Sequence, residues 1–489
     1  MPLTLLRRRL DVELDPAVAF RALHAGSQNA FWLDSGVHAA SGMSYLGASD
    51  DLRRWSSWAE VLEGLTEVGA LASDASSPAA DGTDARRDPA FRLGWVGWLA
   101  YELGTLDEER AGRVPHPAHP VAVFLRVDRA VEFDHATGAV TLVALESPDA
   151  ESWFAETTAA LRAAARAAAT GADAASTAPS TARSTAAPPL ASAPLRIATV
   201  RHDYETYEQL VEECKRVIER GDAYQLCLTN EFGLDDEPGA RPDPLETYLR
   251  LRAASPSHHG GYLRAGDTAL LSTSPEQFLA VTPDRTVITR PIKGTRPRGA
   301  GPVEDALLRA ELAASEKERA ENLMIVDLMR NDLSRVCAVG TVRVTSLLEV
   351  ESYRQVHQLV STVEGTLAEG VTGPDAVAAC FPAGSMTGAP KRSAMSHLAT
   401  LEGAPRGIYS GAFGYLSFDG SIDLAMVIRS IVLTPGRASV GSGGGITALS
   451  DASDEVEETR VKAAALLAVL GARAPERPET RSGREHGNL

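Results

Sequence analysis

The pattern of apolar and polar positions along the chain predicts a mixture of strands and helices. Short β-branched and aromatic runs between turn residues predict strands at 121–127, 139–145, 224–232, 286–289 and 341–350. Apolar residues spaced three and four apart predict helices at 207–220, 306–336, 374–381, 391–402 and 455–470. Because these elements do not alternate strictly, we expect an α+β fold in which large antiparallel sheets pack against helices.

Two predictions concern how neighbouring strands pair. Residues 269–274 and 277–281 flank a Ser-Pro-Glu turn and are predicted to form a hairpin. Residues 411–418, 421–433 and 437–441 are predicted to form a three-stranded antiparallel run. Alternation along 421–433 places Arg429 in mid-strand, where it needs a carboxylate from Asp423, another acid or a ligand.

Composition divides the chain into two parts. Residues 169–194 consist mostly of Ala, Thr, Ser and Pro, a composition that cannot bury a core and predicts a linker. We therefore expect an N-terminal α+β domain at 1–168, a second domain at 195–473 and a disordered tail at 474–489. A stretch at 75–87 is expected to be a disordered insertion in the first domain.

Charge and cysteine content limit the class of protein. The chain has 489 residues and a formal net charge of -17, which disfavours nucleic-acid and anionic-membrane partners. The N-terminus lacks the order of a signal peptide, and no apolar run is long enough to span a bilayer. Cys214, Cys227, Cys337 and Cys380 lack metal-like or disulfide-framework spacing, so we expect a reducing cytoplasm.

The stretch R-P-I-K-G-T-R-P-R-G at 290–299 places Lys293 among three arginines, after the predicted strand 286–289. A free lysine has a pKa near ~10.4, and nearby cations and a dry pocket both lower the pKa. Lysines become nucleophiles in this way. Lys293 is therefore a candidate nucleophile on a Gly/Pro loop, with a solvated basic loop as the alternative.

Two predicted helices carry pairs of glutamates three residues apart, so each pair shares a helix face. The pairs are Glu318 with Glu321 and Glu455 with Glu458, and Lys462 lies one turn beyond the second pair. Mg²⁺ prefers oxygen ligands and usually takes one or two carboxylates. The alternative is a solvated surface, with Glu458 and Lys462 as an i,i+4 ion pair.

Three other features offer chemistry or an ordinary structural role. The stretch S-V-G-S-G-G-G-I at 439–446 can present backbone N–H groups to an anion, or form a flexible hairpin connection. His357 is either a site residue or a hydrogen-bonded core histidine. Glu276 can act as a general acid if it is buried, and is otherwise an ordinary turn residue.

These pieces, in this order, resemble the chorismate-utilising enzyme family from about residue 203 to 471. This family includes anthranilate, aminodeoxychorismate, isochorismate and salicylate synthases. The resemblance rests on the blocks G-D-A-Y-Q-L, S-P-E-Q-F, P-I-K-G-T-R-P-R-G, E-R-A-E-N-L-M-I-V-D-L-M-R-N-D-L, F-P-A-G-S-M-T-G-A-P-K, G-I-Y-S-G-A-F-G-Y-L and E-E-T-R-V-K. It implies an anthranilate-synthase-like fold.

The resemblance also implies roles for individual residues. Chorismate is the implied substrate and Mg²⁺ the cofactor, without pyridoxal phosphate. The metal ligands would be Glu321 and Glu458, supported by Glu318 and Glu455. The catalytic residues would be Lys293, Glu276 and His357, with Glu276 protonating the departing C4 hydroxyl. The substrate-binding residues would be Gln225, Gly294, Thr295, Tyr409, Arg429, Gly443, Gly444, Gly445 and Lys462.

Within the family, Lys293 resembles the aminodeoxychorismate branch, in which the lysine of P-I-K-G-T adds to C2 of chorismate. Ammonia then adds at C4 and expels the lysine. Gln225 stands where the water-using relatives have a lysine base, which favours ammonia as the nucleophile. The alternative is the anthranilate branch, which typically has alanine in P-I-A-G-T.

The expected ammonia source lies on another chain. No cysteine stands in the G-x-C-x-G elbow of a glutaminase, so the resemblance implies a separate glutamine amidotransferase subunit. The N-terminal stretch F-W-L-D-S also resembles the aminodeoxychorismate branch. Whether this part binds an amino-acid effector is left open.

Overall fold

The structure is a computed structural model that describes residues 3–37, 39–71, 90–105, 120–170, 195–237 and 241–477. The predicted insertion at 75–87 lies outside the described residues. So do residues 171–194 of the linker predicted at 169–194, and residues 478–489 of the tail predicted at 474–489. Among the described residues, no helix is long and apolar enough to cross a membrane.

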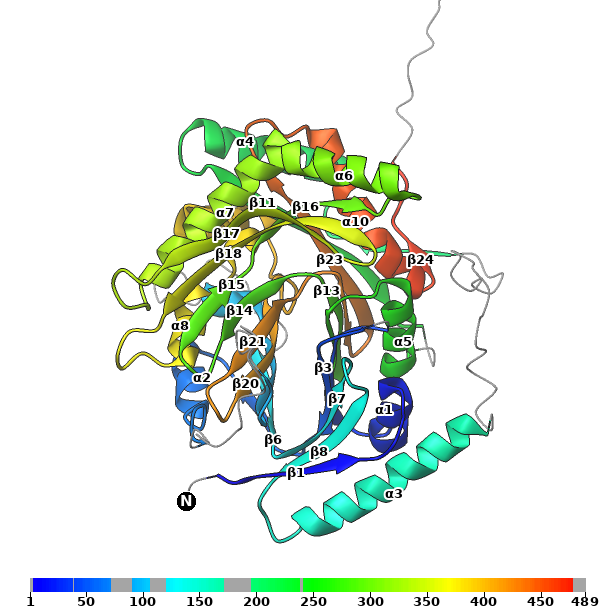
Figure 1. The fold of residues 1–489 in the computed structure, drawn as a ribbon. Helices are drawn as coiled ribbons and strands as arrows, with labels where there is room; N and C mark the ends of the chain where they lie inside the picture. The colour runs from blue at the N-terminus through cyan, green and yellow to red at the C-terminus, as the bar shows by residue number, and fades with distance from the viewer. Residues whose placement is uncertain are drawn as a thin grey trace, which may run out of the picture.

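Two large antiparallel sheets lie face to face in the centre of the molecule (Figure 1). Within the described residues, the larger sheet has twelve strands. In spatial order these are β1 (Leu5–Leu10), β8 (Ala139–Leu145), β7 (Arg129–Asp134), β3 (Met43–Ala48), β2 (Asn29–Asp34), β12 (His259–Ala265), β13 (Thr268–Ser274), β22 (Ser430–Thr434), β23 (Arg437–Ile446), β11 (Gln225–Asp235) and β10 (Thr199–Val200), with β19 (Gly388–Ala389) also paired to β11.

The described part of the smaller sheet has ten strands. In spatial order these are β16 (Ile292–Pro297), β18 (Val356–Thr366), β15 (Thr286–Thr289), β14 (Gln277–Val281), β21 (Ile422–Met426), β20 (Ala412–Ser417), β5 (Gly94–Leu99), β6 (Ala122–Val127) and β4 (Leu52–Trp55), with β17 (Arg343–Ser352) also paired to β18. A short parallel pair joins β9 (Arg196–Ile197) to β24 (Ala472–Arg473).

Helices cover the outer faces of both sheets (Figure 1). On the larger sheet lie α1 (Pro16–His24), α3 (Ala150–Ala169), α4 (Tyr204–Glu219), α5 (Pro244–Ala254), α9 (Lys391–Glu402) and α10 (Ala452–Val469). On the smaller sheet lie α2 (Trp58–Gly64), α6 (Pro302–Ala314), α7 (Glu316–Ser334) and α8 (Gly373–Cys380), with the short 3-10 turns η1 (Tyr101–Gly104) and η2 (Gly384–Met386). The predicted α+β class is confirmed.

Strands from both sides of residues 169–194 share both sheets. In the larger sheet, β2 pairs with β12, and in the smaller sheet β5 pairs with β20. The described residues up to 170 and those from 195 onward therefore form one two-sheet body. The sheets do not divide at the predicted boundary between 1–168 and 195–473, because each part completes the hydrogen-bond ladders of the other.

Strand β2 shows why the sheets lack simple alternation of apolar and polar residues. Phe31 and Leu33 pack into the core between the two sheets, while Trp32 on the opposite face packs against Phe20 of α1. A strand that is buried on both faces has an almost continuous apolar sequence. The apolar stretch F-W-L at 31–33 is therefore buried in the centre of the fold.

The predicted hairpin at Ser274-Pro275-Glu276 is wrong. Strand β13 belongs to the larger sheet and β14 to the smaller one, so the chain crosses between sheets at Pro275 and Glu276. Proline has no N–H to continue the ladder of β13, which favours such a break. The turn residues were located correctly, but they connect two layers.

The predicted three-stranded run is only partly correct. β20 pairs with β21 and β22 pairs with β23, as expected, but residues 421–433 do not form one strand. Strand β21 belongs to the smaller sheet and β22 to the larger one, with Arg429 at the crossing in a left-handed conformation, φ 51°. The two crossings lie side by side. The Thr273 N–H donates to the Arg429 carbonyl at 3.2 Å, and the Met426 N–H donates to the Glu276 carbonyl at 3.0 Å.

Four other elements also differ from the predictions. The helix predicted at 306–336 is divided at Ser315, whose hydroxyl caps α7 by accepting the Glu318 N–H at 3.5 Å. Residues 292–297 form strand β16, where a loop was expected, and the Gly-rich stretch belongs to strand β23. Helix α3 was not predicted, because its Ala-rich sequence resembles the stretch that follows it.

Candidate functional site

Lys293 lies on a β-bulge in strand β16. Ile292 pairs with Val360 and Thr295 with Gln358, so two residues of β16 stand opposite one residue of β18. Gly294, the second of these two residues, takes a left-handed conformation at φ +84°, which a glycine adopts without steric cost. The bulge brings the Lys293 Nζ to 3.6 Å from the Glu321 carboxylate on α7.

The arginines around Lys293 do not act on it as expected. Arg290 pairs with Glu351, Arg296 with Glu311 at 2.9 Å, and Arg298 with Asp305 at 2.7 Å. Burial lowers the pKa of Lys293, but the Glu321 and Glu276 carboxylates outweigh burial and hold the pKa above its ordinary value. The expectation that arginines keep this amine neutral is therefore wrong, because each is compensated by its own carboxylate.

Glu276 is buried, as a general acid at this turn requires. Burial raises the pKa of Glu276 to about 7, although the nearby charge of Lys293 opposes the increase. The Ser385 hydroxyl also lies close enough to lower the pKa of Glu276. A carboxyl group with a pKa near neutrality can donate a proton under physiological conditions.

The four predicted metal ligands come from α7 and α10 and now contact cations or a hydroxyl group. Glu318 lies 3.6 Å from Arg296, Glu458 pairs with Lys462 at 2.6 Å, and Glu455 accepts the Ser450 hydroxyl at 2.8 Å. Within the described ranges, no group of three or more His, Cys, Asp or Glu side chains is already arranged to hold a metal ion.

The donor set nevertheless fits a divalent cation. A Cβ on Gly444 would lie 2.7 Å from Glu455 Oε2 and 4.0 Å from Glu458 Oε1, so these carboxylates converge on the same glycine. Burial raises the pKa of Glu455, and the charge of Glu458 raises it further. Carboxylates from two helices beside Lys293 give Mg²⁺ the oxygen ligands and opposite charge that it needs.

Glycines in β23 allow side chains to lie directly against the strand. A Cβ on Gly441 would overlap the Tyr409 ring at 2.1 Å, and one on Gly445 would lie 2.1 Å from Gln225 Nε2. The Lys293 Nζ is 3.5 Å from that same Gly445 position. The Gly-rich stretch, for which an anion-binding loop and a flexible connection were both considered, is therefore a strand. Tyr409 lies against it at Gly441, and Gln225 and Lys293 meet at Gly445.

Gly443 and Gly444 have ladder partners, because Gly443 stands opposite Thr229 and Gly444 opposite Leu228 on β11. The Gly443 carbonyl also accepts the Lys462 Nζ at 2.8 Å. The i,i+4 pair of Glu458 and Lys462 is present, as the surface alternative predicted. The same lysine therefore ties α10 to the glycine strand.

Arg429 lies at the crossing between sheets rather than in mid-strand. Its Nη1 donates to the Lys462 carbonyl at 3.3 Å. Among the described residues, no carboxylate lies within ion-pair distance of the guanidinium, so Asp423 is not its partner. Arg429 therefore remains available to a substrate carboxylate.

His357 makes the contacts of a hydrogen-bonded core histidine. Its ring nitrogens lie 2.8 Å from the Ser352 hydroxyl and 3.0 Å from Asp305, and its side chain is buried. Both nitrogens are thus occupied by neighbours in the fold. Thr295, which pairs across the sheet with Gln358, is exposed on β16.

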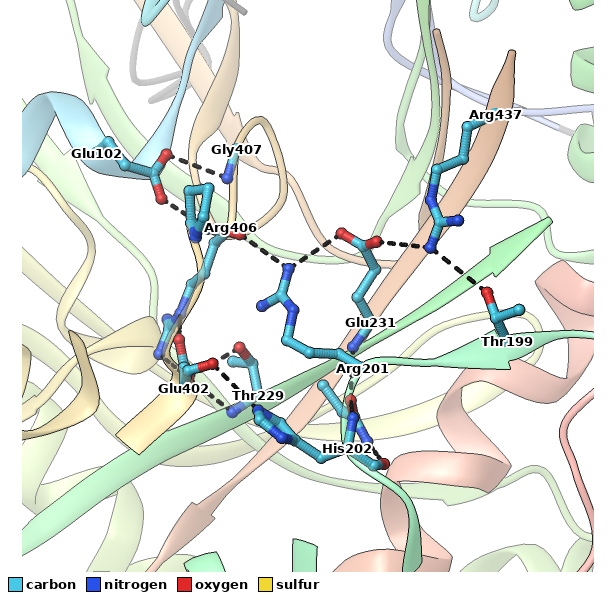
Figure 2. A network of polar contacts seen from close by, with 12 residues as sticks. Glu102, Thr199, Arg201, His202, Thr229, Glu231, Glu402, Arg406, Gly407 and Arg437 are labelled. Carbon is cyan, nitrogen blue, oxygen red and sulfur yellow. Dashed lines mark hydrogen bonds and ion pairs between the residues drawn. The ribbon is translucent and has the colours of Figure 1, made fainter. Parts of the chain in front are cut away.

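A buried ion pair holds β11 in place behind the glycine strand. Figure 2 shows Arg406 and Glu402 beside Thr229 of β11. The Thr229 N–H and hydroxyl both donate to Glu402 Oε1 at 2.9 Å, and Arg406 donates to the Cys227 carbonyl at 2.8 Å and the Met386 carbonyl at 2.7 Å. Arg406 therefore connects β11 to η2, the segment that carries Ser385.

Sequence reasoning did not single out this pair or Ser385. The motif blocks F-P-A-G-S-M-T-G and the segment before G-I-Y-S-G contain Ser385 and Arg406, so the resemblance marked their neighbourhood. Neither has a spacing that predicts its contacts. Ser385 contacts Glu276, and Arg406 contacts Cys227. In each contact the two residues are more than one hundred positions apart in the sequence.

Comparisons with known proteins agree with this arrangement. The model of the chorismate binding enzyme family matches residues 28–468. The chain is 44% identical over 388 residues to an aminodeoxychorismate synthase of Streptomyces pristinaespiralis, covering 78% of this chain and 51% of that protein. It is 42% identical over 498 residues to an aminodeoxychorismate synthase of Streptomyces griseus, covering 97% of this chain and 66% of that protein.

A solved structure supports the same grouping. Anthranilate synthase component I from Streptococcus pneumoniae aligns with a TM-score of 0.65 at 28% identity, covering 94% of this chain and 99% of the other. The chain therefore belongs to the chorismate-binding enzyme family. It spans only about half to two thirds of the length of the two Streptomyces relatives.

Proposed function

We propose that this chain is the synthase part of an aminodeoxychorismate synthase, which converts chorismate and ammonia to 4-amino-4-deoxychorismate. The observation that carries the proposal is Lys293. It lies on a bulge beside Glu321 and the glycine strand, and its charge acts on the pKa of Glu276. The two Streptomyces relatives bear the name of this activity.

The chemistry has two steps. In the first, Lys293 gives its ammonium proton to solvent, and the neutral amine bonds to C2 of chorismate. The ring double bonds shift, the C4–O bond breaks and Glu276 protonates the C4 hydroxyl, which leaves as water. In the second, ammonia bonds to C4, the C2–Nζ bond breaks and its electron pair returns to Lys293. Covalent catalysis of this kind divides one difficult substitution into two easier ones.

Other residues hold the substrate in this proposal. The unpaired Arg429 guanidinium, Tyr409 and the backbone of Gly443 to Gly445 bind the enolpyruvyl carboxylate. Gln225 lies beside Lys293 against Gly445. In this position it would contact the ring of bound chorismate. Lys462 orients the glycine strand through the Gly443 carbonyl.

A magnesium ion completes the proposed site. Glu321 and Glu458 would hold it, supported by Glu318 and Glu455, and when bound it supplies positive charge for the ring carboxylate of chorismate. We further propose that a glutamine amidotransferase subunit or domain supplies the ammonia. The four cysteines are free and buried, in keeping with a reducing compartment such as the cytoplasm.

Product analysis tests the function. Wild type, Lys293→Ala and the surface control Lys215→Ala are incubated with chorismate, Mg²⁺ and ammonium, with and without an aminodeoxychorismate lyase, and analysed by mass spectrometry. Wild type and Lys215→Ala should yield 4-aminobenzoate only when the lyase is present. Lys293→Ala should lose at least about 100-fold of this activity. Anthranilate formed by wild type without the lyase would instead assign the chain to the anthranilate branch.

A further inference from the structure

A small cavity lies beside Glu276, between the smaller sheet and helix α7. Its walls include Phe278, Pro291, Ile325 and Met329, and it is closed by η2 at Ser385. The cavity is large enough for about one water-sized molecule. None of its lining residues belongs to β11, β23 or α10, which carry Gln225, the strand glycines and Glu458.

Two polar side chains in the lining of this cavity are buried, and one of them lacks a hydrogen-bond partner. The Ser385 hydroxyl is buried, with 8% of the residue exposed, and makes no hydrogen bond of normal geometry to any described residue. The other is the Glu276 carboxyl, which is also only 8% exposed. A buried hydroxyl without a partner is costly, so such groups usually have a small bound molecule as partner.

The remaining polar side chains of the lining are already bonded. Gln277 donates to Asp423 at 2.8 Å, and the Thr289 hydroxyl donates to the Phe278 carbonyl at 2.9 Å. A small occupant would therefore find the Ser385 hydroxyl, which has no partner, and the Glu276 carboxyl beside it, surrounded by apolar walls. Apolar walls favour a neutral molecule over an ion.

We propose that this cavity holds the ammonia molecule that attacks C4, with hydrogen bonds to Ser385 Oγ and the Glu276 carboxylate. The inference rests on the proposed function and deepens it. Glu276 protonates the oxygen on C4, so the cavity beside Glu276 gives ammonia access to the same carbon. Chorismate bound against the glycine strand would block an approach from that side.

The proton balance agrees with this position. Glu276 is left ionised when the C4 hydroxyl departs as water. Ammonia bonds to C4 and carries one proton too many, and it returns that proton to the Glu276 carboxylate. The C2–Nζ bond breaks at the same time, and Lys293 regains its electron pair and recovers its proton from solvent. Each group thus returns to its starting state.

Two variants and one matched control test the site in the full chain with free ammonium. Ser385→Ala removes the hydroxyl, and Ala383→Val fills the cavity from its η2 wall. Ser421→Ala removes another fully buried hydroxyl that lacks a partner but lies outside the cavity. The readouts are the KM for ammonium, the KM for chorismate, and the rate of Lys293 adduct formation without ammonium, followed by intact-protein mass spectrometry.

Ser385→Ala should raise the KM for ammonium about 5-fold, because the loss of one hydrogen bond weakens binding by about this factor. Ala383→Val should raise it at least about 10-fold, while adduct formation and the KM for chorismate stay within about 2-fold of wild type. Ser421→Ala should leave all three unchanged. If Ala383→Val does not fold, the KM for ammonium of Ser385→Ala alone tests the proposed ammonia site.

An unchanged KM for ammonium in Ser385→Ala would overturn the inference. So would an equal fall in adduct formation, because Ser385 would then support Glu276 as an acid rather than bind ammonia. These outcomes leave the proposed function intact. If wild type forms no amine product at any ammonium concentration, the proposed function fails and the ammonia site fails with it.

Discussion

At the scale of single residues, the site depends on groups whose environments change their protonation. Glu276 has a pKa of about 7 because it is buried, against an ordinary value of 4.5. As a general acid Glu276 must be protonated, whereas the nucleophile Lys293 must be neutral and has a raised pKa. The value of kcat/KM for chorismate should therefore rise with pH below about 7 and level off above it, where the loss of the Glu276 proton offsets the gain in neutral Lys293. Glu276→Gln should lose about 10²- to 10⁴-fold of the rate and this part of the pH profile.

The same carboxyl group makes stability depend on pH. Its pKa is higher in the folded than in the unfolded state, so its contribution is fully present below the unfolded pKa of 4.5 and lost as pH rises through about 7. The loss should amount to about 3 kcal/mol of unfolding free energy. Urea titrations at about pH 4.5 and about pH 8.5 should show a smaller difference for Glu276→Gln than for wild type.

At the scale of elements, the bulge in β16 positions Lys293. A Cβ on Gly294 would lie 2.8 Å from Leu312 Cδ1 and 2.9 Å from Glu318 Cδ, in a backbone conformation that L-residues rarely adopt. The Gly294→Ala variant should therefore be less stable by about 1–3 kcal/mol. Its activity should fall at least about 10-fold, because a shifted bulge would displace Lys293.

Gly340→Ala provides the matched control for this substitution. Gly340 has nearly the same φ, +82°, but nothing lies within 4 Å of its Cβ position. The Gly340→Ala variant should lose about 1 kcal/mol of unfolding free energy and keep normal activity. Equal activity losses in the two variants, measured alongside their urea midpoints, would show that the bulge does not position Lys293.

The buried ion pair between Arg406 and Glu402 also acts at the scale of elements, because it holds β11 in place. Arg406→Met leaves Glu402 buried without its partner and should destabilise the protein by about 3–5 kcal/mol. The double variant with Glu402→Gln should regain part of this loss, since no unpaired charge remains. Arg437→Met provides the control because Arg437 is partly exposed, and it should cost no more than about 1 kcal/mol in urea unfolding. Similar costs at both arginines would contradict the role given to the buried pair.

At the scale of the whole molecule, neither part of the chain completes its own sheets. Residues 195–489 expressed alone lack the partners of β12 and β20, which are β2 and β5. This fragment should show no cooperative thermal unfolding and no Lys293 adduct. Supplying residues 1–170 as a second chain should restore both, as measured by circular dichroism and mass spectrometry. Cooperative unfolding of the fragment by itself would mean that it forms an independent domain after all.

The sequence by itself determined the local elements and the chemistry of the site. Helices at 207–220 and 391–402 and the strands at 121–127 and 139–145 follow from their own apolar periodicity, and the structure contains them. Glu276 is buried as a general acid requires, and the glutamate pairs of α7 and α10 both reach the space around Lys293. Local patterns were sufficient for the helices and strands, because these depend on residues a few positions apart. The groups around Lys293 come from distant segments, and the sequence indicated them only through the family resemblance.

Only the tertiary structure decided how the strands are distributed between two sheets. Pro275 and Arg429 both lie where the chain crosses between layers, and a local pattern cannot distinguish such a crossing from a turn within one sheet. It also decided that the arginines near Lys293 are neutralised by Glu351, Glu311 and Asp305, and that His357 is held by Ser352 and Asp305. Charge and burial at these positions depend on partners that are distant in sequence, so they could be known only once the chain had folded.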